Sequence, residues 1–196
     1  MTTALEHILS RKTLTDKRFI SDYKELKRLV DTAKKSGHKI VLTQGVFDLI
    51  HGGHALYLEK CRALGDILIV GIDSDELTRK RKGPGRPIVP QDERLKMMMH
   101  LRHVDIVTLR HAKDQIGRLI RLIRPDVLVV SQSTKDFTQA MKDEYKDVCG
   151  EIVNLPPQST TSTTARIRML TIEGANQLAM EIKQLADDFI QKIKAQ

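Results

Sequence analysis

The chain has 196 residues, of which 40% are hydrophobic, and this is enough for one globular domain with a buried core. A formal net charge of +8 favours anionic partners, either nucleic acid or nucleotides and phosphorylated metabolites. The chain has only two cysteines, far apart in sequence, which argues against a disulfide scaffold. It has no secretory signal, and no apolar run approaches the roughly 20 residues that span a bilayer. We therefore expect a cytoplasmic protein.

Apolar spacing along the chain predicts helices that alternate with strands. The predicted helices cover residues 21–36, 53–64, 91–102, 114–123, 134–150 and the tail from 162. The predicted strands cover residues 39–44, 67–73, 104–109, 126–131 and 151–156. The basic segment 79–90, rich in glycine and proline, is predicted to be a loop, and the methionine run 97–99 is expected to pack in the core.

The predicted strands are continuous apolar runs, without the alternation of a sheet that has one face in water. This pattern is typical of a parallel sheet covered by helices on both faces. We therefore predict an α/β fold, a Rossmann-like, doubly wound, five-stranded parallel sheet with flanking helices and a helical C-terminal tail. Residues 1–37 would form an N-terminal helical extension, 38–170 the main domain, and 171–196 a helix packed on the domain or on a partner subunit.

The loop after the first predicted strand carries two histidines, His51 and His54, in the stretch GVFDLIHGGHALYL. A zinc site would need a third ligand, and the stretch offers only Asp48 and no cysteine. A purely structural role for one or both histidines is the simpler alternative. The glycines between them allow a ligand to approach the backbone, and the start of the following helix is a natural anion site. A phosphate site is the interpretation that uses every residue of the stretch.

The same stretch resembles the HxGH signature of the nucleotidyltransferase superfamily. Class I aminoacyl-tRNA synthetases share this signature, but the chain is too short for one and has no KMSKS-like segment. Three further segments, GDILIVGIDSDELTRKRKG, RPIVPQDERLKMM and STTSTTARIR, resemble successive motifs of the cytidylyltransferase-like branch. The resemblance covers residues 38–170 and is closest to sugar-phosphate (heptose 1-phosphate) adenylyltransferase domains, then to glycerol-3-phosphate cytidylyltransferases.

The resemblance implies transfer of a nucleoside monophosphate from a nucleoside triphosphate to a small phosphorylated acceptor, such as a sugar 1-phosphate, with release of pyrophosphate. ATP is the favoured triphosphate and CTP the next, Mg²⁺ is the implied cofactor, and a homodimer is favoured. Cytidylyl transfer to glycerol 3-phosphate or another polyol phosphate is the alternative within the branch. Outside it, a non-catalytic, basic nucleic-acid-binding protein and a triphosphate sensor without turnover are less favoured alternatives.

The resemblance also implies roles for individual residues. The catalytic residues, which would hold phosphates and stabilise the transition state, are His51, His54, Lys82 and Arg94. The nucleotide would contact Thr43, Gly45, Val46, Phe47, Asp48, Gly53, Asp73, Asp75, Ser162, Thr163 and Thr164. The acceptor or its phosphate would contact Arg79 and Arg86, and Asp48 would orient a histidine or help to hold Mg²⁺. Helix capping is the alternative for Asp75 and for the hydroxyl residues.

Two departures from the family pattern concern substrate choice. Gln44 follows Thr43 at a position where these adenylyltransferases usually carry asparagine. The segment VSQSTKDF at 130–137 stands where relatives commonly show glycine and aspartate. Since that segment helps to form the substrate pocket in the family, we expect acceptor specificity to depend on it.

Overall fold

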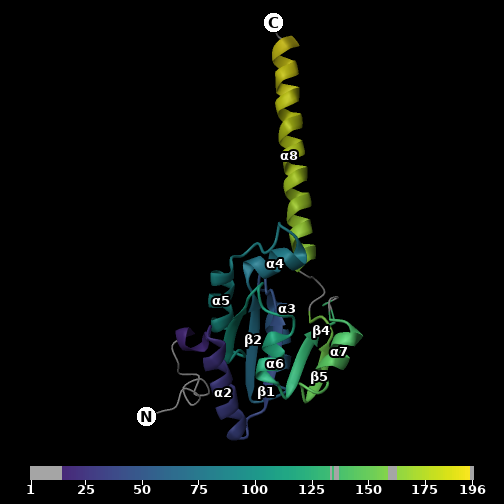
Figure 1. The fold of residues 1–196 in the computed structure, drawn as a ribbon. Helices are drawn as coiled ribbons and strands as arrows, with labels where there is room; N and C mark the ends of the chain where they lie inside the picture. Colours follow the sequence, from purple (N-terminus) through teal and green to yellow (C-terminus); the bar gives the residue numbers. More distant parts are fainter. Residues whose placement is uncertain (1–14, 133, 135–136, 159–162, 195–196) are drawn as a thin grey trace. The chain divides into compact units, whose positions relative to one another are not determined.

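The computed structural model describes residues 15–132, 134, 137–158 and 163–194, and Figure 1 shows a sheet with helices on both faces. The strands are β1 Ile40–Gly45, β2 Ile67–Asp73, β3 Ile106–Arg110, β4 Val127–Ser131 and β5 Glu151–Leu155. The helices are the 3-10 turn η1 Thr15–Arg18 and the α-helices α2 Tyr23–Lys35, α3 Gly52–Arg62, α4 Asp75–Lys82, α5 Gln91–His100, α6 Arg118–Ile123, α7 Gln139–Tyr145 and α8 Thr163–Lys194.

All strand pairs of the sheet are parallel, and the strand order is β3-β2-β1-β4-β5. The predicted five-stranded parallel sheet is therefore confirmed. After β3 the chain crosses to the other side of β1, so the direction of strand addition reverses between β1 and β4. Proteins with open α/β sheets bind their ligands beyond the carboxyl ends of the strands at such a reversal. The loop after β1 is at this place.

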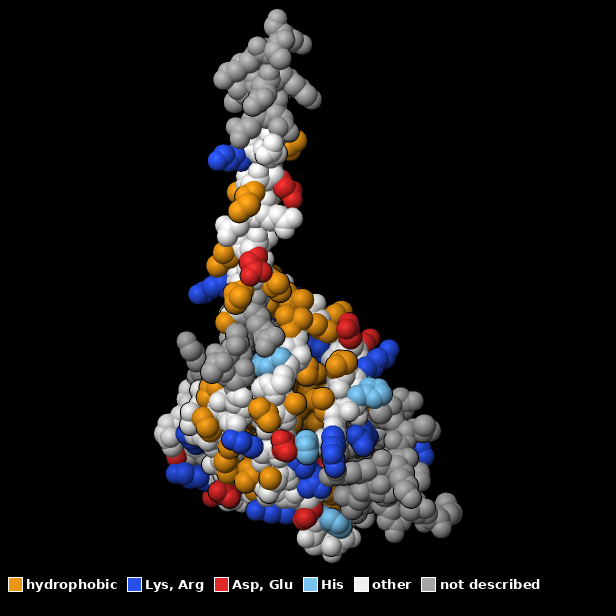
Figure 2. Space-filling view, turned by 180° about the vertical axis from the view of Figure 1, so that it is seen from behind, with side chains coloured by type: hydrophobic (Ala, Val, Ile, Leu, Met, Phe, Trp, Pro, Cys, Tyr) orange, Lys and Arg blue, Asp and Glu red, His pale blue; other side chains and the backbone are white. Residues whose placement is uncertain are grey.

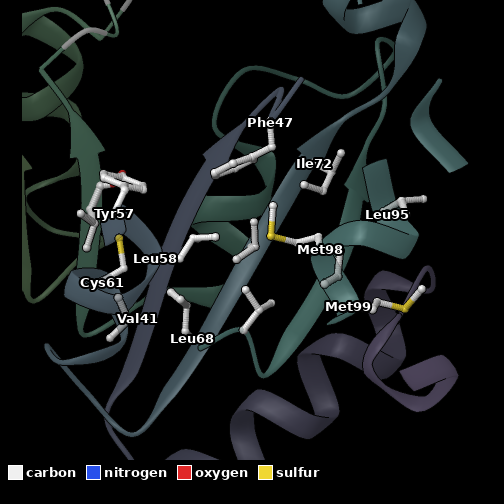
Figure 3. Close-up of a cluster of buried hydrophobic side chains, with 14 of the residues drawn as sticks. Val41, Phe47, Tyr57, Leu58, Cys61, Leu68, Ile72, Leu95, Met98 and Met99 are labelled. Atoms are coloured by element: carbon white, nitrogen blue, oxygen red, sulfur yellow. The ribbon is translucent and has the colours of Figure 1, made fainter. Parts of the chain in front are cut away.

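Two hydrophobic clusters fill the space between the sheet and its helices, one on each face. Helices α2, α6 and α7 cover the first face, with the buried residues Leu26, Val30, Ala33, Leu119, Ile120, Ile123 and Tyr145. Helices α3 and α5 cover the second, with the buried residues Tyr57, Leu58, Cys61, Leu95, Met98 and Met99 (Figure 3). The expected core role of the methionines holds for Met98 and Met99, whereas Met97 is 47% exposed on the outer side of α5.

Helix α2 belongs to the same core, although the sequence predicted a separate extension up to residue 37. Leu26 and Val30 are at most 1% exposed, because the apolar stripe of α2 faces the sheet. Just before α2, Phe19 forms a parallel bridge with Val107 of β3. The segment that we expected to precede the domain is therefore one of its covering layers.

The basic segment after β2 is more helical than predicted. Residues 79–82 form the last turn of α4, where we expected a loop from 79 to 90. Ser74 caps the helix, since its Oγ accepts a hydrogen bond from the backbone N–H of Leu77 at 3.1 Å. Gly83, with φ of 94°, ends it. The loop is thereby limited to residues 83–90, and four cations are placed on a helix.

The chain divides into two compact units, one up to Gln158 and one from Ser159. The first contains the sheet and helices α2 to α7, and the second contains α8. Helix α8 is continuous across residue 170, where we had placed a domain boundary. Within the described ranges, no helix is long and apolar enough to cross a membrane.

Candidate functional site

Helix α3 begins directly after the loop that carries the HxGH signature. His51 is its N-cap residue, and the Nδ1 atom of His51 accepts a hydrogen bond from the backbone N–H of Gly53 at 3.1 Å. The Nδ1 atom of His54 reaches back and accepts from the backbone N–H of His51 at 3.3 Å. The two ring centroids are 4.1 Å apart. Two imidazoles thus form the reciprocal cap that a serine or threonine and a glutamate form in many helices.

These caps decide which nitrogen of each ring carries the proton. Because Nδ1 of both rings accepts a backbone N–H, the neutral ring carries its proton on Nε2. Burial and the charges of His51 and Lys82 lower the pKa of His54 to about 4, against a smaller opposite effect of Asp48. We expected the pair to donate N–H groups and also to carry charge. At pH 7 His54 is neutral, so it is a hydrogen-bond donor and not a resident cation.

The loop between β1 and α3 is fastened by one carboxylate. Phe47 and Leu49 have φ of 50° and 48°, in the left-handed region that non-glycine residues rarely adopt. Between them Asp48 is 3% exposed, and its carboxylate accepts from the backbone N–H groups of residues 88–89, both at 2.9 Å. Arg86 pairs with the same carboxylate at 3.0 Å. Asp48 and Arg86 therefore join two loops. The contact of Arg86 with the acceptor and the role of Asp48 toward a histidine or Mg²⁺ stay predictions.

The donor set of the described residues does not fit a metal ion held by protein alone. No group of three or more His, Cys, Asp or Glu side chains within these residues is arranged to hold one. The oxygens of Asp48 already accept two backbone N–H groups and a guanidinium. Mg²⁺ usually keeps several waters and binds through substrate phosphates with one or two carboxylates. A Mg²⁺ ion would therefore be coordinated mainly by the triphosphate.

Arg94 is 1% exposed, and its guanidinium joins three segments of the site. Its Nη1 donates to the backbone carbonyls of Val46 at 2.6 Å and Asp73 at 2.9 Å. Its Nε donates to the carbonyl of Val89 at 2.9 Å, and its Nη2 pairs with the carboxylate of Asp75 at 2.6 Å. We predicted a phosphate ligand at Arg94, but these bonds and its burial give it a structural role instead. The ribose contact of Asp75 stays a prediction.

Residues of β1 were predicted to contribute to the site through their backbone, and this stays a prediction. Thr43 is fully buried, and its hydroxyl bonds to the hydroxyl of Tyr57 at 2.8 Å and to the carbonyl of Val129 at 3.1 Å. A Cβ atom at Gly45 would lie 3.1 Å from the ring of Phe47, so glycine leaves room for that buried ring. The side chain of Thr43 therefore holds β1 against α3 and β4.

Helix α4 brings part of the basic segment to the histidines. Its last turn contains four consecutive cations, 79–82. Burial is the main cause of the lowered pKa of His54, and the charges of His51 and Lys82 add to it. Arg79 is exposed on the same helix. The structure thus brings together His51, His54 and Lys82 of the predicted catalytic set.

Asp73 was predicted to contact the nucleotide, but it is fully buried and holds two arginines. Arg81 of α4 pairs with its Oδ2, and Arg110 at the end of β3 pairs with its Oδ1 at 2.6 Å. We had not identified Arg110 as a site residue. Arg110 had one signal in the sequence, since it directly follows a predicted strand and thus lies at the edge where ligands of such sheets bind.

Two predicted sites concern the starts of helices. Ser74, and not Asp75, caps α4. Ser162 and the side chains of Thr163 and Thr164 lie outside the described residues, so their contact with the nucleotide stays a prediction.

A cavity of about 440 Å³ lies at the carboxyl edge of the sheet, between β1, β4, α4, α6 and α7. Gln44 of β1 lines it, and so do Thr134 and Phe137 after β4. These positions belong to the two departures from the family pattern that we noted in the sequence. Both departures therefore lie in the wall of one cavity.

Comparison with known proteins supports the family resemblance that the sequence motifs suggested. A family model described as cytidylyltransferase-like matches residues 42–184, which is more than half of the chain. The bifunctional protein HldE of Desulfatibacillum aliphaticivorans is 39% identical over 144 residues, which are 74% of this chain and 29% of that protein. HldE of Salmonella arizonae is 39% identical over 150 residues, 76% of this chain and 31% of that protein. The chain thus spans about a third of the length of these curated relatives.

Solved structures show the same fold. The lipopolysaccharide core biosynthesis protein from Thermoplasma volcanium is 30% identical with a TM-score of 0.53, over 62% of this chain and 98% of that one. Pantoate–β-alanine ligase from Francisella tularensis is 16% identical, also with a TM-score of 0.53, over 74% of this chain and 68% of that one. The second likeness concerns the fold alone.

Replacing Arg94 with methionine should destabilise the protein. The change leaves three buried carbonyl groups and a carboxylate without their donor, so we expect the free energy of unfolding to fall by about 3–5 kcal/mol. Urea denaturation without nucleotide measures this change. Lys96→Met, on the exposed side of the same helix, is the control and should shift stability by less than about 0.5 kcal/mol. Wild-type stability combined with lost triphosphate binding would restore the original assignment of Arg94.

The lowered pKa of His54 should give the stability of the protein a pH dependence. An unfolded histidine titrates at about 6.5, so between that pH and about 4 the unfolded chain binds the proton that folded His54 does not. The free energy of unfolding should therefore fall as the pH drops through this window. In His54→Gln, whose amide oxygen can still cap His51, that part of the slope should disappear. An unchanged slope in urea denaturation series would contradict the assigned shift.

Proposed function

The chain belongs to the cytidylyltransferase-like family, and on this premise we propose that it transfers a nucleoside monophosphate from a nucleoside triphosphate to a sugar phosphate. Membership makes it a nucleotidyltransferase, as the HxGH signature led us to expect. The observation that carries the proposal is the pair of imidazoles at the start of α3, whose Nδ1 atoms cap the helix and whose Nε2 positions carry the protons. ATP is the proposed donor and a sugar 1-phosphate the proposed acceptor, because the matched relatives include HldE and a lipopolysaccharide core biosynthesis protein.

The reaction needs charge stabilisation more than it needs a base. The second pKa of a phosphate monoester is about 6, so the acceptor is largely a dianion at pH 7. An acceptor oxygen attacks the α-phosphorus, a new P–O bond forms, and the bond to the β-phosphate breaks with release of pyrophosphate. His51 and His54 would donate N–H groups to oxygens around the α–β junction, with Lys82 adding a positive charge. The N-terminus of α3 favours the same anion.

Mg²⁺ is the proposed cofactor, and it would arrive with the triphosphate. When bound, it supplies neutralisation of charge on the phosphate oxygens. The described residues would contribute little direct coordination, because Asp48 fastens the two loops. The residues at the start of α3 would orient the triphosphate there.

A basic nucleic-acid-binding protein has less support. On the face shown in Figure 2, Lys and Arg side chains lie among acidic and hydrophobic ones. Part of the basic segment is engaged in ion pairs with buried carboxylates, since Arg81 pairs with Asp73 and Arg86 with Asp48. Such a distribution favours a small anionic ligand over a nucleic acid.

The proposed activity is tested with a panel of triphosphates and acceptors. ATP with Mg²⁺ should raise the melting temperature more than CTP, GTP or UTP does. Pyrophosphate should then be released when a sugar 1-phosphate is added, and polyol phosphates test the cytidylyltransferase alternative. His54→Ala should lose at least about 100-fold in turnover, the size of effect seen when one donor to a developing charge is removed. Binding of nucleic acid with a steep salt dependence, and no response to any triphosphate, would favour the non-catalytic alternative.

We also propose that α8 mediates a homodimer. Its exposed apolar residues Leu178, Ile182 and Leu185 follow each other at intervals of four and three, and are 57%, 58% and 69% exposed. Ala175 and Phe189 continue this spacing on either side. A repeat of this kind places apolar side chains on one seam, which a second copy of the helix can cover in a coiled coil.

Sedimentation equilibrium tests the dimer. Ile182→Glu places a charge in the seam and should produce monomers. Met180→Glu makes the same change at a position that is 71% exposed and off the seam, and should leave the dimer intact. A wild-type monomer at high protein concentration, or equal effects of the two variants, would contradict the proposal.

A further inference from the structure

Two arginines far apart in sequence meet in the wall of the cavity. Arg81 comes from the last turn of α4 and Arg110 from the end of β3, and both line the cavity. Each donates through Nη1 to a different oxygen of Asp73, which is fully buried at the end of β2. A buried carboxylate thereby holds two guanidinium groups side by side. Such a pair is suited to an anion with several oxygens, because each guanidinium carries five N–H donors in a fixed plane.

Gly71 makes the position of Arg110 possible. A Cβ atom at Gly71 would lie 2.7 Å from Leu119, 3.0 Å from the Cδ atom of Arg110 and 3.3 Å from Gln44. A larger residue at position 71 would therefore displace Leu119, Arg110 and Gln44. Since these two side chains both line the cavity, the glycine shapes its floor.

The charges around the cavity favour an anionic ligand. Among the described lining residues Asp114 is the one carboxylate, and it pairs with Arg118 at 2.6 Å. Lys80, Arg81 and Arg110 also line the cavity, and Asp73 beneath them pairs with both arginines. Together these three cations and Asp73 carry a net charge of +2. The arginine side chains are 27% and 21% exposed, so both can be reached from the cavity.

The rest of the wall would suit an organic group of modest size. Leu119, Leu128, Val130, Phe137 and Met141 supply apolar surface, and Gln44 supplies an amide. The volume of about 440 Å³ lies within the range of small-molecule sites, about 300–1,000 Å³. The cavity therefore combines a cationic corner with a mostly apolar interior.

Helix α4 connects this cavity with the histidine site. Arg81 and Lys82 are consecutive, so their Cα atoms are about 3.8 Å apart. Arg81 pairs with Asp73, while the charge of Lys82 acts on His54. An anion on the arginine pair would thus lie beside the place proposed for the triphosphate.

We propose that Arg81 and Arg110, held by Asp73, bind the phosphate group of the acceptor, and that the acceptor is a phosphate monoester whose organic part fills the cavity. This assignment rests on the proposed nucleotidyl transfer. It makes Arg81 and Arg110 residues that determine the choice of acceptor. It also gives a reason why Gln44, Thr134 and Phe137, which belong to the two departures from the family pattern, line this cavity.

Calorimetric titration of the full chain with inorganic phosphate, without nucleotide, tests the subsite. Arg81→Gln and Arg110→Gln keep an amide that can bond to Asp73, and each should weaken phosphate binding at least 10-fold. Arg102→Gln, an exposed position after α5, is the charge-matched control and should bind phosphate like the wild type. His54→Gln should weaken the triphosphate response and leave unchanged the phosphate binding that the two arginine variants lose. Arg110→Lys should recover part of the affinity, and melting temperatures identify any variant that has lost its fold.

The two proposals fail in different ways. If no triphosphate binds, the proposed nucleotidyl transfer is refuted, whether or not inorganic phosphate binds. If pyrophosphate is released but Arg81→Gln and Arg110→Gln bind phosphate like the wild type, the subsite is overturned. It is also overturned if the wild type binds no phosphate at millimolar concentrations. With an acceptor found in the pyrophosphate assay, the arginine variants should raise its KM at least 10-fold and leave the KM of the triphosphate within about twofold.

Discussion

The buried guanidinium of Arg94 is the interaction on which the geometry of the site depends. It holds the carbonyls of Val46, Asp73 and Val89 and the carboxylate of Asp75, and so joins the end of β1, the end of β2 and the start of α5. A charge is expensive to remove from water, and only such complete pairing makes it tolerable. No shorter side chain could reach three carbonyls from one point on α5. Through these bonds Arg94 holds the end of β1, the end of β2 and the first turn of α4 next to α5.

Around that connection, carboxylates serve as supports for other groups. Asp48 lies between Phe47 and Leu49, which both have positive φ, and its carboxylate binds the backbone of residues 88–89. Asp73 holds a pair of arginines. A loop with two left-handed residues persists only when its surroundings fix it. The acids therefore stiffen the site, while the groups that would meet the ligand are imidazoles, guanidiniums and an ammonium. This division suits a reaction between two polyanions.

The sequence was sufficient to predict the parallel sheet, because continuous apolar strands that alternate with helices leave few alternative folds. It also identified the histidine loop, since glycines and histidines at a strand-to-helix turn have few other uses. It could not show that Arg94 and Asp48 bind parts of the protein, because a motif gives the residue type and not the direction of the side chain. Arg110 was missed for a related reason: its partner Asp73 is 37 positions away, and only the pairing of β2 with β3 brings them together.

The histidine caps have one more consequence. A histidine passes a proton along only if both of its ring nitrogens can exchange hydrogen-bond partners. In His51 and His54 the Nδ1 atoms accept the N–H groups that start α3, and turning either ring over would open the first turn of the helix. Neither ring can therefore serve as a proton relay while the helix stays capped. The Nδ1 atoms thus cap the start of α3, and only the Nε2 side of each ring is left to interact with a ligand.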